Sequence, residues 1–120
     1  MCFRGGTPFR HYVCLPCRSS FKKRGVWDSR CARCGGELID AGQDLEVPER
    51  SDKAGWRTLT ALLNAGVTFH ARCCYGPGWR PRTPREVRER LAAAAGTGVA
   101  VSVALTTVDV DELRAGRASR

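Results

Sequence analysis

Two Cys-x-x-Cys pairs constrain this chain more than any other feature of its sequence: Cys14 with Cys17, and Cys31 with Cys34. Each pair places two sulfurs on one tight turn, and the thirteen residues between the pairs let the chain double back so that four thiolates form a tetrahedron. We therefore predict one structural site for Zn²⁺, which readily accepts a closed cage of four sulfurs. A rubredoxin-type iron centre uses the same four thiolates, so the choice between zinc and iron stays open.

A redox dithiol is the alternative for either pair. Such a motif normally opens a helix after a strand in a βαβ unit, and no unit of that kind is recognisable around either pair. A closed cage of four sulfurs also leaves no coordination position for a substrate. Because the sequence also lacks a glycine-rich phosphate loop, paired catalytic carboxylates and a serine nucleophile elbow, we predict a protein that is not an enzyme and takes no small-molecule substrate.

The length of 120 residues allows one small domain, or a ribbon with an attached helical part. The first forty residues hold few aliphatic side chains, so a metal would substitute for the core that they cannot supply. No stretch is apolar enough to span a bilayer, and the first six residues lack the charged-then-apolar order of a secretory signal. With seven cysteines, an odd number, we expect a cytoplasmic protein whose cysteines bind metal instead of forming disulfides.

The formal charge of +8 is distributed unevenly along the chain. Residues 1–34 hold eight Arg or Lys and one acid, for a net charge of +7, whereas residues 35–52 hold six acids and one Arg, for −5. Residues 53–91 return to +6, with eight basic residues and two acids. Two basic blocks separated by an acidic strip favour a polyanion as partner. The alternatives are that the arginines are only solvated, or that they neutralise a doubly negative zinc–thiolate centre.

Composition divides the chain into five parts. They are a flexible lead-in (1–10), a zinc ribbon (11–40), an acidic linker (41–52), a helical part with a C-terminal strand (53–113) and a frayed tail (114–120). The predicted fold class is therefore a small α+β protein, in which an N-terminal zinc ribbon of four cysteines packs with two helices and a C-terminal strand.

Within the ribbon we predict a short strand over residues 11–13, a turn or hairpin limb over 18–25 with Phe21 inward, and an outgoing strand over 37–39. Gly35 directly follows the second cysteine pair, where a positive φ points backbone N–H groups at the sulfurs. Arg18 takes the equivalent place after the first pair, so the first turn is expected to be less regular.

Two helices have clear sequence signals. Ser51 or Asp52 can cap a helix that runs to residue 63 or 64 and ends near Gly66, with an apolar face at three- and four-residue spacing (Trp56, Leu59, Leu62 and Leu63). Thr83, Pro84 and Glu86 occupy the N-cap, N1 and N3 positions of a capping box, which starts a second helix over residues 84–95 that ends at Gly96.

The C-terminal part has weaker signals. Residues 99–105 are apolar and β-branched and are predicted to form a strand, although their period does not separate a strand from a buried helix. Asp109 with Glu112 can cap a last short turn.

His70, Cys73 and Cys74 form a second candidate site. With Cys2 or His11 they could complete a second tetrahedron, or they could assist the first metal. A His–Cys pair could also supply a nucleophile. Against both, cysteine is among the most buried residue types, so simple packing is the first interpretation of these residues.

Basic residues with interleaved aromatics suggest two surfaces for nucleic acid, on which cations meet phosphates and an aromatic ring stacks on a base. The first surface lies in the ribbon (Lys22, Lys23, Arg24, Trp27, Arg30 and Arg33), and the second follows the loop that begins at residue 75 (Trp79, Arg80, Arg82, Arg85 and Arg88). A solvated face is the alternative for each surface.

Six short motifs occur in a recognisable order: Cys-Leu-Pro-Cys-Arg, Cys-x-x-Cys-Gly-Gly, Arg-Ser-Asp-x-x-Gly-Trp, Ala-Gly-Val-x-Phe-His, Cys-Cys-x-Gly-Pro-Gly and Arg-Pro-Arg-Thr-x-Arg-Glu-Val-Arg-Glu-Arg. Between residues 12 and 91 this order resembles a group of short cytosolic zinc-ribbon proteins from high-GC Gram-positive bacteria. The resemblance implies that the ribbon, the helix that contains Trp56 and residues 70–78 form one unit, and it implies no mechanism.

Some members of that group carry the name deoxyxylulose-5-phosphate synthase. A thiamine-diphosphate enzyme needs a cofactor-binding Gly-Asp-Gly stretch that ends in Asn, a magnesium site and two substantial α/β domains, and this chain has none of them. We therefore do not expect that activity.

Two functions fit these features best. The first is a non-catalytic module with a structural zinc that contacts RNA, DNA or a nucleoprotein complex, such as the ribosome or the transcription machinery. The second is a protein–protein adaptor that uses residues 75–79 and the acidic strip. An enzyme centred on His70, Cys73 and Cys74 is a third hypothesis, and no contact with a membrane is expected.

Overall fold

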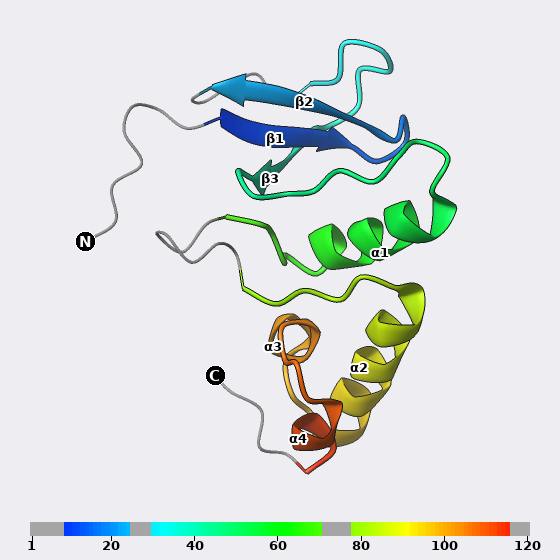
Figure 1. Cartoon of the computed structure of the whole chain (residues 1–120), viewed down its shortest axis with the longest axis vertical. Helices are drawn as coiled ribbons and strands as arrows, with labels where there is room; N and C mark the ends of the chain where they lie inside the picture. The colour runs from blue at the N-terminus through cyan, green and yellow to red at the C-terminus, as the bar shows by residue number, and fades with distance from the viewer. Residues whose placement is uncertain (1–8, 25–29, 71–77, 116–120) are drawn as a thin grey trace, which may run out of the picture. The chain divides into compact units, whose positions relative to one another are not determined.

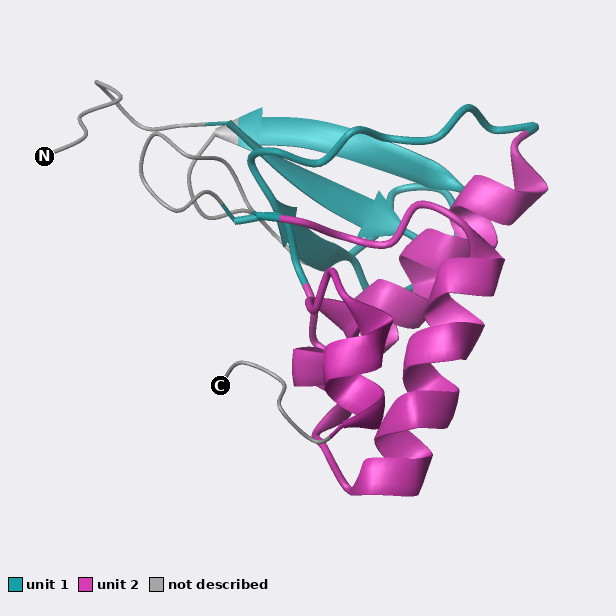
Figure 2. Ribbon diagram, turned by 60° about the horizontal axis from the view of Figure 1, so that its bottom comes forward, with its two compact units in different colours: residues 1–51, 68–78 teal, residues 52–67, 79–120 magenta. Residues whose placement is uncertain are grey.

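The computed structural model describes residues 9–24, 30–70 and 78–115 (Figure 1). The chain forms two compact units, which Figure 2 shows in different colours. The first unit comprises Met1–Ser51 and Thr68–Gly78, and the second comprises Asp52–Val67 and Trp79–Arg120. Residues 68–70 therefore belong with the cysteine pairs, although composition placed them in the helical part. The helix that contains Trp56 belongs to the second unit, and not to one unit with the ribbon as the resemblance implied.

The first unit is built on an antiparallel sheet of strand order β2-β1-β3. Its strands are β1 (Phe9–Cys14), β2 (Ser19–Arg24) and β3 (Ile39–Gly42). Tyr12 of β1 lies opposite Phe21 of β2, and both belong to the apolar core that contains Cys14, Cys31 and Leu38. The predicted inward position of Phe21 is thus confirmed.

Strand β1 begins earlier than predicted. Phe9 and Arg10, which composition assigned to a flexible lead-in, pair with Arg24 and Lys23 of β2. The Gly and Pro residues that suggested a break all precede residue 9, and the aromatic and β-branched residues Phe9, Tyr12 and Val13 suit a strand.

Strand β3 begins later than predicted. It starts at Ile39 and includes Ala41 and Gly42, which composition assigned to the acidic linker. Glu37, at the expected strand start, makes only an isolated bridge with Arg30. Asp and Gly are depleted in strands, so the local sequence favours a loop, whereas pairing with β1 supplies the backbone hydrogen bonds that make it a strand.

Residues 68–70 run alongside β3. The backbone N–H of Phe69 donates to the carbonyl oxygen of Ala41 at 2.7 Å, and the carbonyl oxygen of Phe69 accepts from the N–H of Asp44 at 3.0 Å. Gly42 permits this approach, because a Cβ at that position would lie 2.4 Å from the backbone nitrogen of His70, and its φ of +95° also favours glycine. The extended piece that the sequence predicted around residue 68 is therefore hydrogen-bonded to the chain at β3.

The second unit begins with α1 (Lys53–Asn64), which confirms the first predicted helix. The side chain of Asp52 caps it by accepting from the backbone N–H of Gly55 at 2.9 Å. The helix is followed by Gly66 at a φ of +81°. The predicted apolar face is buried (Trp56, Leu59, Leu62 and Leu63).

Helix α2 (Pro84–Thr97) begins with the predicted capping box. The Thr83 hydroxyl accepts from the N–H of Glu86 at 3.2 Å, and the Glu86 carboxylate accepts from the N–H of Thr83 at 3.2 Å. The predicted end of this helix was wrong by two residues. Gly98, and not Gly96, adopts the left-handed conformation (φ +77°) that terminates it, and the Gly98 N–H donates to the carbonyl of Ala94.

The predicted C-terminal strand is wrong, because that segment forms α3 (Val101–Leu105). In the described part of the second unit there is no strand with which it could pair, so its backbone groups bond locally, as when the N–H of Ala104 donates to the carbonyl of Ala100 at 3.0 Å. One helical turn also buries Ala104 and Leu105 completely. The last predicted turn is confirmed as α4 (Val110–Arg114), which Asp109 caps.

The second unit has an apolar core of its own. Ala93 and Ala94 of α2 pack with Ala104 of α3 and Leu113 of α4. Val99 and Val110 pack against this cluster. Together, the two units make a small α+β protein with three strands and four helices in its described part. None of the helices in the described ranges has the length and apolar character needed to cross a bilayer.

Candidate metal centre

The first cysteine pair lies on the turn between β1 and β2. Cys14 is the last residue of β1 and is fully buried, and Cys17 follows on the turn, half-buried. The turn closes when the backbone N–H of Arg18 donates to the carbonyl oxygen of Leu15 at 3.2 Å. Among the described residues, Arg18 is the only one other than glycine with a positive φ, at +49°. The expected irregularity of this turn is confirmed, and the left-handed conformation costs a residue with a Cβ roughly 1 kcal/mol.

The second cysteine pair lies on a turn that is closed by two backbone hydrogen bonds. The N–H of Cys31 donates to the carbonyl of Gly36, and the N–H of Gly35 donates to the carbonyl of Cys31, both at 2.8 Å. Gly35 has a φ of +72°, as predicted. The neighbouring Gly36 leaves little room for a side chain, because a Cβ there would lie only 3.2 Å from the sulfur of Cys34.

Backbone N–H groups point at two of the sulfurs. The N–H of Arg33 donates to the Sγ of Cys31, and the N–H of Gly36 donates to the Sγ of Cys34, both at 3.4 Å. Such bonds orient a ligand sulfur and stabilise negative charge on it. Here they come from the turn that Gly35 shapes, so the same backbone conformation presents the second cysteine pair and supports its charge.

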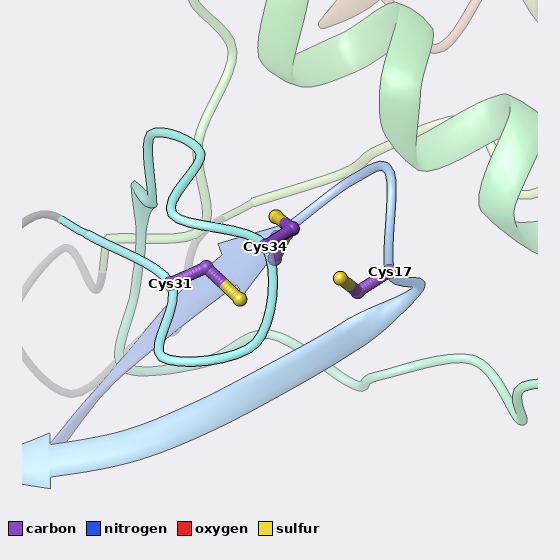
Figure 3. A group of neighbouring side chains, drawn as sticks. Cys17, Cys31 and Cys34 are labelled. Atoms are coloured by element: carbon purple, nitrogen blue, oxygen red, sulfur yellow. The ribbon is translucent and has the colours of Figure 1, made fainter.

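The four cysteine sulfurs converge. The Sγ atoms of Cys14, Cys17, Cys31 and Cys34 all lie within 4.8 Å of one another, and those of Cys14 and Cys34 are 3.6 Å apart. In Figure 3 the side chains of Cys17, Cys31 and Cys34 project from the two turns toward a common space. A tetrahedral zinc with bonds of about 2.3 Å holds its sulfurs about 3.8 Å apart. The four cysteines therefore lie together and could hold a metal ion with only small adjustments of their side chains.

The thiols differ in how readily they ionise. The backbone N–H groups of Cys34 and Arg33 lower the pKa of Cys31 to about 7. Hydrogen bonds from the other thiols, first of all Cys14, raise the pKa of Cys17 to about 12, and burial raises the pKa of Cys14. Without a cation the cage thus favours one thiolate, on Cys31. A bound divalent ion supplies the positive charge that allows the remaining thiols to lose their protons.

Exposed cations lie on and beside the two cysteine turns, and a further one lies on β2. Arg18 follows the first pair, Arg30 and Arg33 flank and enter the second, and Lys22 lies on β2. Arg30 donates through Nη1 to the carbonyl of Gly35 at 3.2 Å, which ties it to the second turn. Within residues 9–24, 30–70 and 78–115, none of these four cations forms an ion pair with a carboxylate. Trp27 and the side chain of Arg24 lie outside the described part of the structure, and Lys23 is half-buried.

Several residues of the second predicted nucleic-acid surface already have partners within the chain. The guanidinium of Arg90 lies 4.4 Å from the ring centroid of Trp79. Arg80 donates to the carbonyl of Trp79 at 2.9 Å, and Arg85 approaches Glu89 at 3.9 Å. The remaining two cations of this predicted surface, Arg82 and Arg88, are exposed.

His70 has side-chain partners at both ring nitrogens. Its Nδ1 is 2.7 Å from the hydroxyl of Thr68, and its Nε2 is 3.4 Å from a carboxylate oxygen of Asp40, whose other oxygen is 3.3 Å from Arg10. Neither nitrogen is directed at the four-cysteine cage, and among the described residues no other group of metal-binding side chains converges. Cys2, Cys73 and Cys74 lie outside the described residues, so the second site stays a prediction.

His11, the other histidine, lies on β1. Its ring is not part of the group of side chains that could hold a metal ion. Burial, followed by the charge of Lys22, lowers its pKa. Its Nδ1 is buried without a hydrogen-bond partner among the described atoms. The imidazole is therefore predicted to be neutral at neutral pH.

Two residues of the first unit were missed by the sequence analysis. Gly36 approaches a ligand sulfur, but the sequence offered only the Gly-Gly pair as a signal. Phe9 was counted with the lead-in, whereas it begins β1 and leaves 43% of its surface exposed, with Lys22 over its ring. The aromatic and β-branched residues Phe9, Tyr12 and Val13 were the available signal.

Comparisons of the chain with protein-family models, curated proteins and solved structures find no match.

Proposed function

We propose that the first unit is a zinc ribbon that binds nucleic acid or a nucleoprotein complex in the cytoplasm, and that its metal is structural. We also propose that the chain is related to the short bacterial zinc-ribbon proteins that its motifs resemble. Four thiolates fill the coordination sphere of Zn²⁺, so the ion has no position for a substrate and organises the two turns instead. This supports a binding module that is not an enzyme, and it gives no support to a synthase activity.

The observation that carries the proposal is the set of exposed cations on and beside the cysteine turns, with one more on β2. Arg18, Lys22, Arg30 and Arg33 have no carboxylate partner among the described residues, although the first unit also holds several acids. Cations that are exposed and unpaired are available to phosphates, and a polyanion gains affinity by releasing its counterions to them. Folding the turns around a metal would hold Arg18, Arg30 and Arg33 together.

The structure gives less support to the second basic surface. The Trp79 ring is stacked by Arg90, and Arg85 has Glu89 as a neighbour, so both already have intramolecular roles. We therefore place the main contact on the first unit, at Arg18, Lys22, Arg30 and Arg33 together with the neighbouring Lys23, Arg24 and Trp27. Arg82 and Arg88 are retained as secondary contacts.

The metal is tested on natively purified protein by elemental analysis together with a count of alkylatable thiols. We expect one zinc per chain and protection of four of the seven cysteines from alkylation. Iron in place of zinc would change the ion but keep the ribbon. Two zinc ions per chain would support the second site at His70, Cys73 and Cys74. A protein that holds no metal would contradict the proposal at its base.

Nucleic-acid binding is tested by fluorescence anisotropy with labelled RNA and DNA over a range of salt concentrations. We expect the logarithm of affinity to fall linearly with the logarithm of salt concentration. Removing two cations of the first unit (Lys22→Gln with Arg33→Gln) should reduce that slope by about 1.4 for a single strand. The matched control removes the same charge from α2 (Arg85→Gln with Arg88→Gln) and should change the slope less. Equal effects of the two pairs would indicate a non-specific field of charge.

A protein–protein adaptor is the second candidate. The second unit exposes apolar side chains, with 43% of Val101 and 62% of Val108 accessible, and exposed apolar residues suit a protein partner better than a polyanion. An adaptor would bind its partner with a defined stoichiometry and a weak dependence on salt. That result, with no binding to RNA or DNA at low salt, would favour this candidate.

A further inference from the structure

Phe9 is an exposed aromatic residue at the edge of the basic first unit. It begins β1, and the Nζ of Lys22 lies 5.5 Å from the centroid of its ring. In the register of the hairpin, His11 lies opposite Lys22, and Phe9 lies opposite Arg24. Because directly opposed residues of antiparallel strands share a face, Phe9, His11 and Lys22 belong to one face of the hairpin.

The apolar core that includes the cysteines lies on the opposite face. Tyr12 and Phe21 are opposed in the register and belong to the apolar core with Cys14. Phe9 is displaced from Tyr12 by an odd number of residues, so strand alternation directs it away from that core. A phenyl ring that is 43% exposed contributes only part of its apolar area to folding, and the rest faces solvent.

The charge beside the ring points to an anionic ligand. The Lys22 ammonium is exposed, has no carboxylate partner among the described residues and keeps hydrogen-bond donors for other groups while it lies over the ring. An aromatic surface next to an exposed cation matches a nucleotide, which joins an aromatic base to a phosphate. The two groups of one nucleotide would be met by neighbouring side chains of one hairpin face.

We propose that Phe9 and Lys22 form a stacking platform for single-stranded nucleic acid, in which an unpaired base stacks on Phe9 and an adjacent phosphate is bound by Lys22. This inference rests on the proposed function and adds the class of polymer to it. In a duplex the bases are stacked on one another and present only their edges in the grooves, so a phenyl ring on a strand cannot reach a base face. A single strand offers base faces that stack on aromatic side chains regardless of sequence.

The test compares a labelled oligouridine with a blunt RNA duplex of mixed sequence, using the full-length, metal-loaded protein. We expect tighter binding of the single strand. Phe9→Ala should lower its affinity roughly 5- to 150-fold, the effect of losing one base stack, and leave the salt dependence unchanged because no charge is removed. Lys22→Gln should instead reduce the salt slope by about 0.7. Phe9→Tyr keeps an aromatic face and should bind like the wild type.

Phe9→Leu guards against a folding artefact, because leucine keeps an apolar side chain in the strand but has no aromatic face. It should retain the metal and lose affinity as the alanine variant does. If Phe9→Leu binds the single strand as tightly as the wild type, or if the duplex binds as well as the single strand, the stacking platform is wrong while the basic surface of the proposed function stands. If neither polymer binds even at low salt, both the platform and the proposed function are wrong.

Discussion

Gly36 shows how closely single residues of the second cysteine turn fit around a sulfur. A methyl group added at this position would lie 3.2 Å from the Sγ of Cys34, whose sulfur also receives the Gly36 N–H. We predict that Gly36→Ala moves this N–H away from the sulfur and lowers metal affinity by about tenfold, as is usual for groups that support a metal ligand. Competition with a coloured zinc chelator measures the change.

Gly96 offers the matched control for this substitution. It lies inside α2, and a Cβ there would have no atom within 4 Å. Gly96→Ala should leave metal affinity unchanged and raise the free energy of unfolding by roughly 0.5 to 1 kcal/mol, because alanine loses less entropy in a helix. Equal metal affinities for Gly36→Ala and the wild type would show that the N–H to sulfur contact does not support the site.

The residues that could be predicted are those whose role follows from a local pattern. The four cysteines and Gly35 follow from Cys-x-x-Cys-Gly, in which ligands and turn lie within five positions. The role of Gly42 depends on residues 69 and 70, which are distant in sequence and approach its backbone. Nothing in the local sequence around Gly42 indicates that approach.

At the scale of the elements, Arg90 joins α2 to the segment between α3 and α4. It is only 5% exposed, and it donates through Nε and Nη2 to the carbonyls of Thr107 at 2.8 Å and Val108 at 2.6 Å. A third bond runs from Nη1 to the carbonyl of Glu86 at 3.1 Å. The sequence presents Arg90 as one more cation in an arginine-rich helix, whereas the structure buries it.

We predict that Arg90→Met lowers the free energy of unfolding by about 2 to 4 kcal/mol, because three carbonyl groups, of which that of Thr107 is in a buried bond, lose a charged donor. Arg90→Lys should be nearly as harmful, since one ammonium cannot reproduce the planar fork of the guanidinium. Arg88→Met, on the exposed side of the same helix, should change stability by no more than about 0.5 kcal/mol. Urea unfolding of metal-saturated protein, followed by helical circular dichroism, gives all three values. A loss of similar size in Arg88→Met would refute a special role for Arg90.

The capping box of α2 should make stability depend on pH. The N–H of Arg82, followed by the hydroxyl and N–H of Thr83, lowers the pKa of the Glu86 carboxyl below its ordinary value. A lowered pKa means that folding favours the carboxylate, so its contribution is complete above the ordinary pKa of about 4.3 and is lost as pH falls through the lowered value. We therefore predict that the stability gap between wild type and Glu86→Gln is present at neutral pH and closes in acid.

This gap is measured with the metal chelated at every pH, so that titration of the thiols is common to both proteins and cancels. Thr83→Ala serves as a comparison that removes the other half of the box, and it should cost about 1 kcal/mol. A gap between wild type and Glu86→Gln that stays constant down to acid pH would show that the carboxylate charge does not contribute to the cap.

The elements differ in how far their sequences determine them. Helices α1 and α2 carry caps and an apolar face within their own residues, so both were predicted. The segment 101–105 carries only apolar residues, which suit a strand or a buried helix equally. Its neighbours decide, because no described strand of the second unit offers an edge and α2 offers an apolar surface. The C-terminal end of β3 was not predicted, because Asp40 and Gly42 disfavour a strand in the local sequence. Pairing with β1 outweighs this local preference.

At the scale of the whole molecule, the two units differ in what makes up their cores. All four converging cysteines belong to the first unit, whose apolar core includes Cys14 and Cys31 themselves. The second unit has a core of alanine and leucine side chains with no metal ligand. We therefore predict that removing the metal unfolds the first unit and leaves the second folded, because metal binding supplies folding free energy only where the ligands are.

Hydrogen exchange of the full-length protein, with and without a strong zinc chelator, measures this separation. Amides of β1, β2 and β3 should lose their protection when the metal is removed, while those of α1 and α2 keep most of theirs. Cys34→Ser, which removes one ligand without any chelator, should reproduce the pattern and exclude an effect of the chelator itself. If the helices lose protection together with the strands, the two units fold as one cooperative system. If the strands keep their protection without metal, the four cysteines do not form a structural metal site.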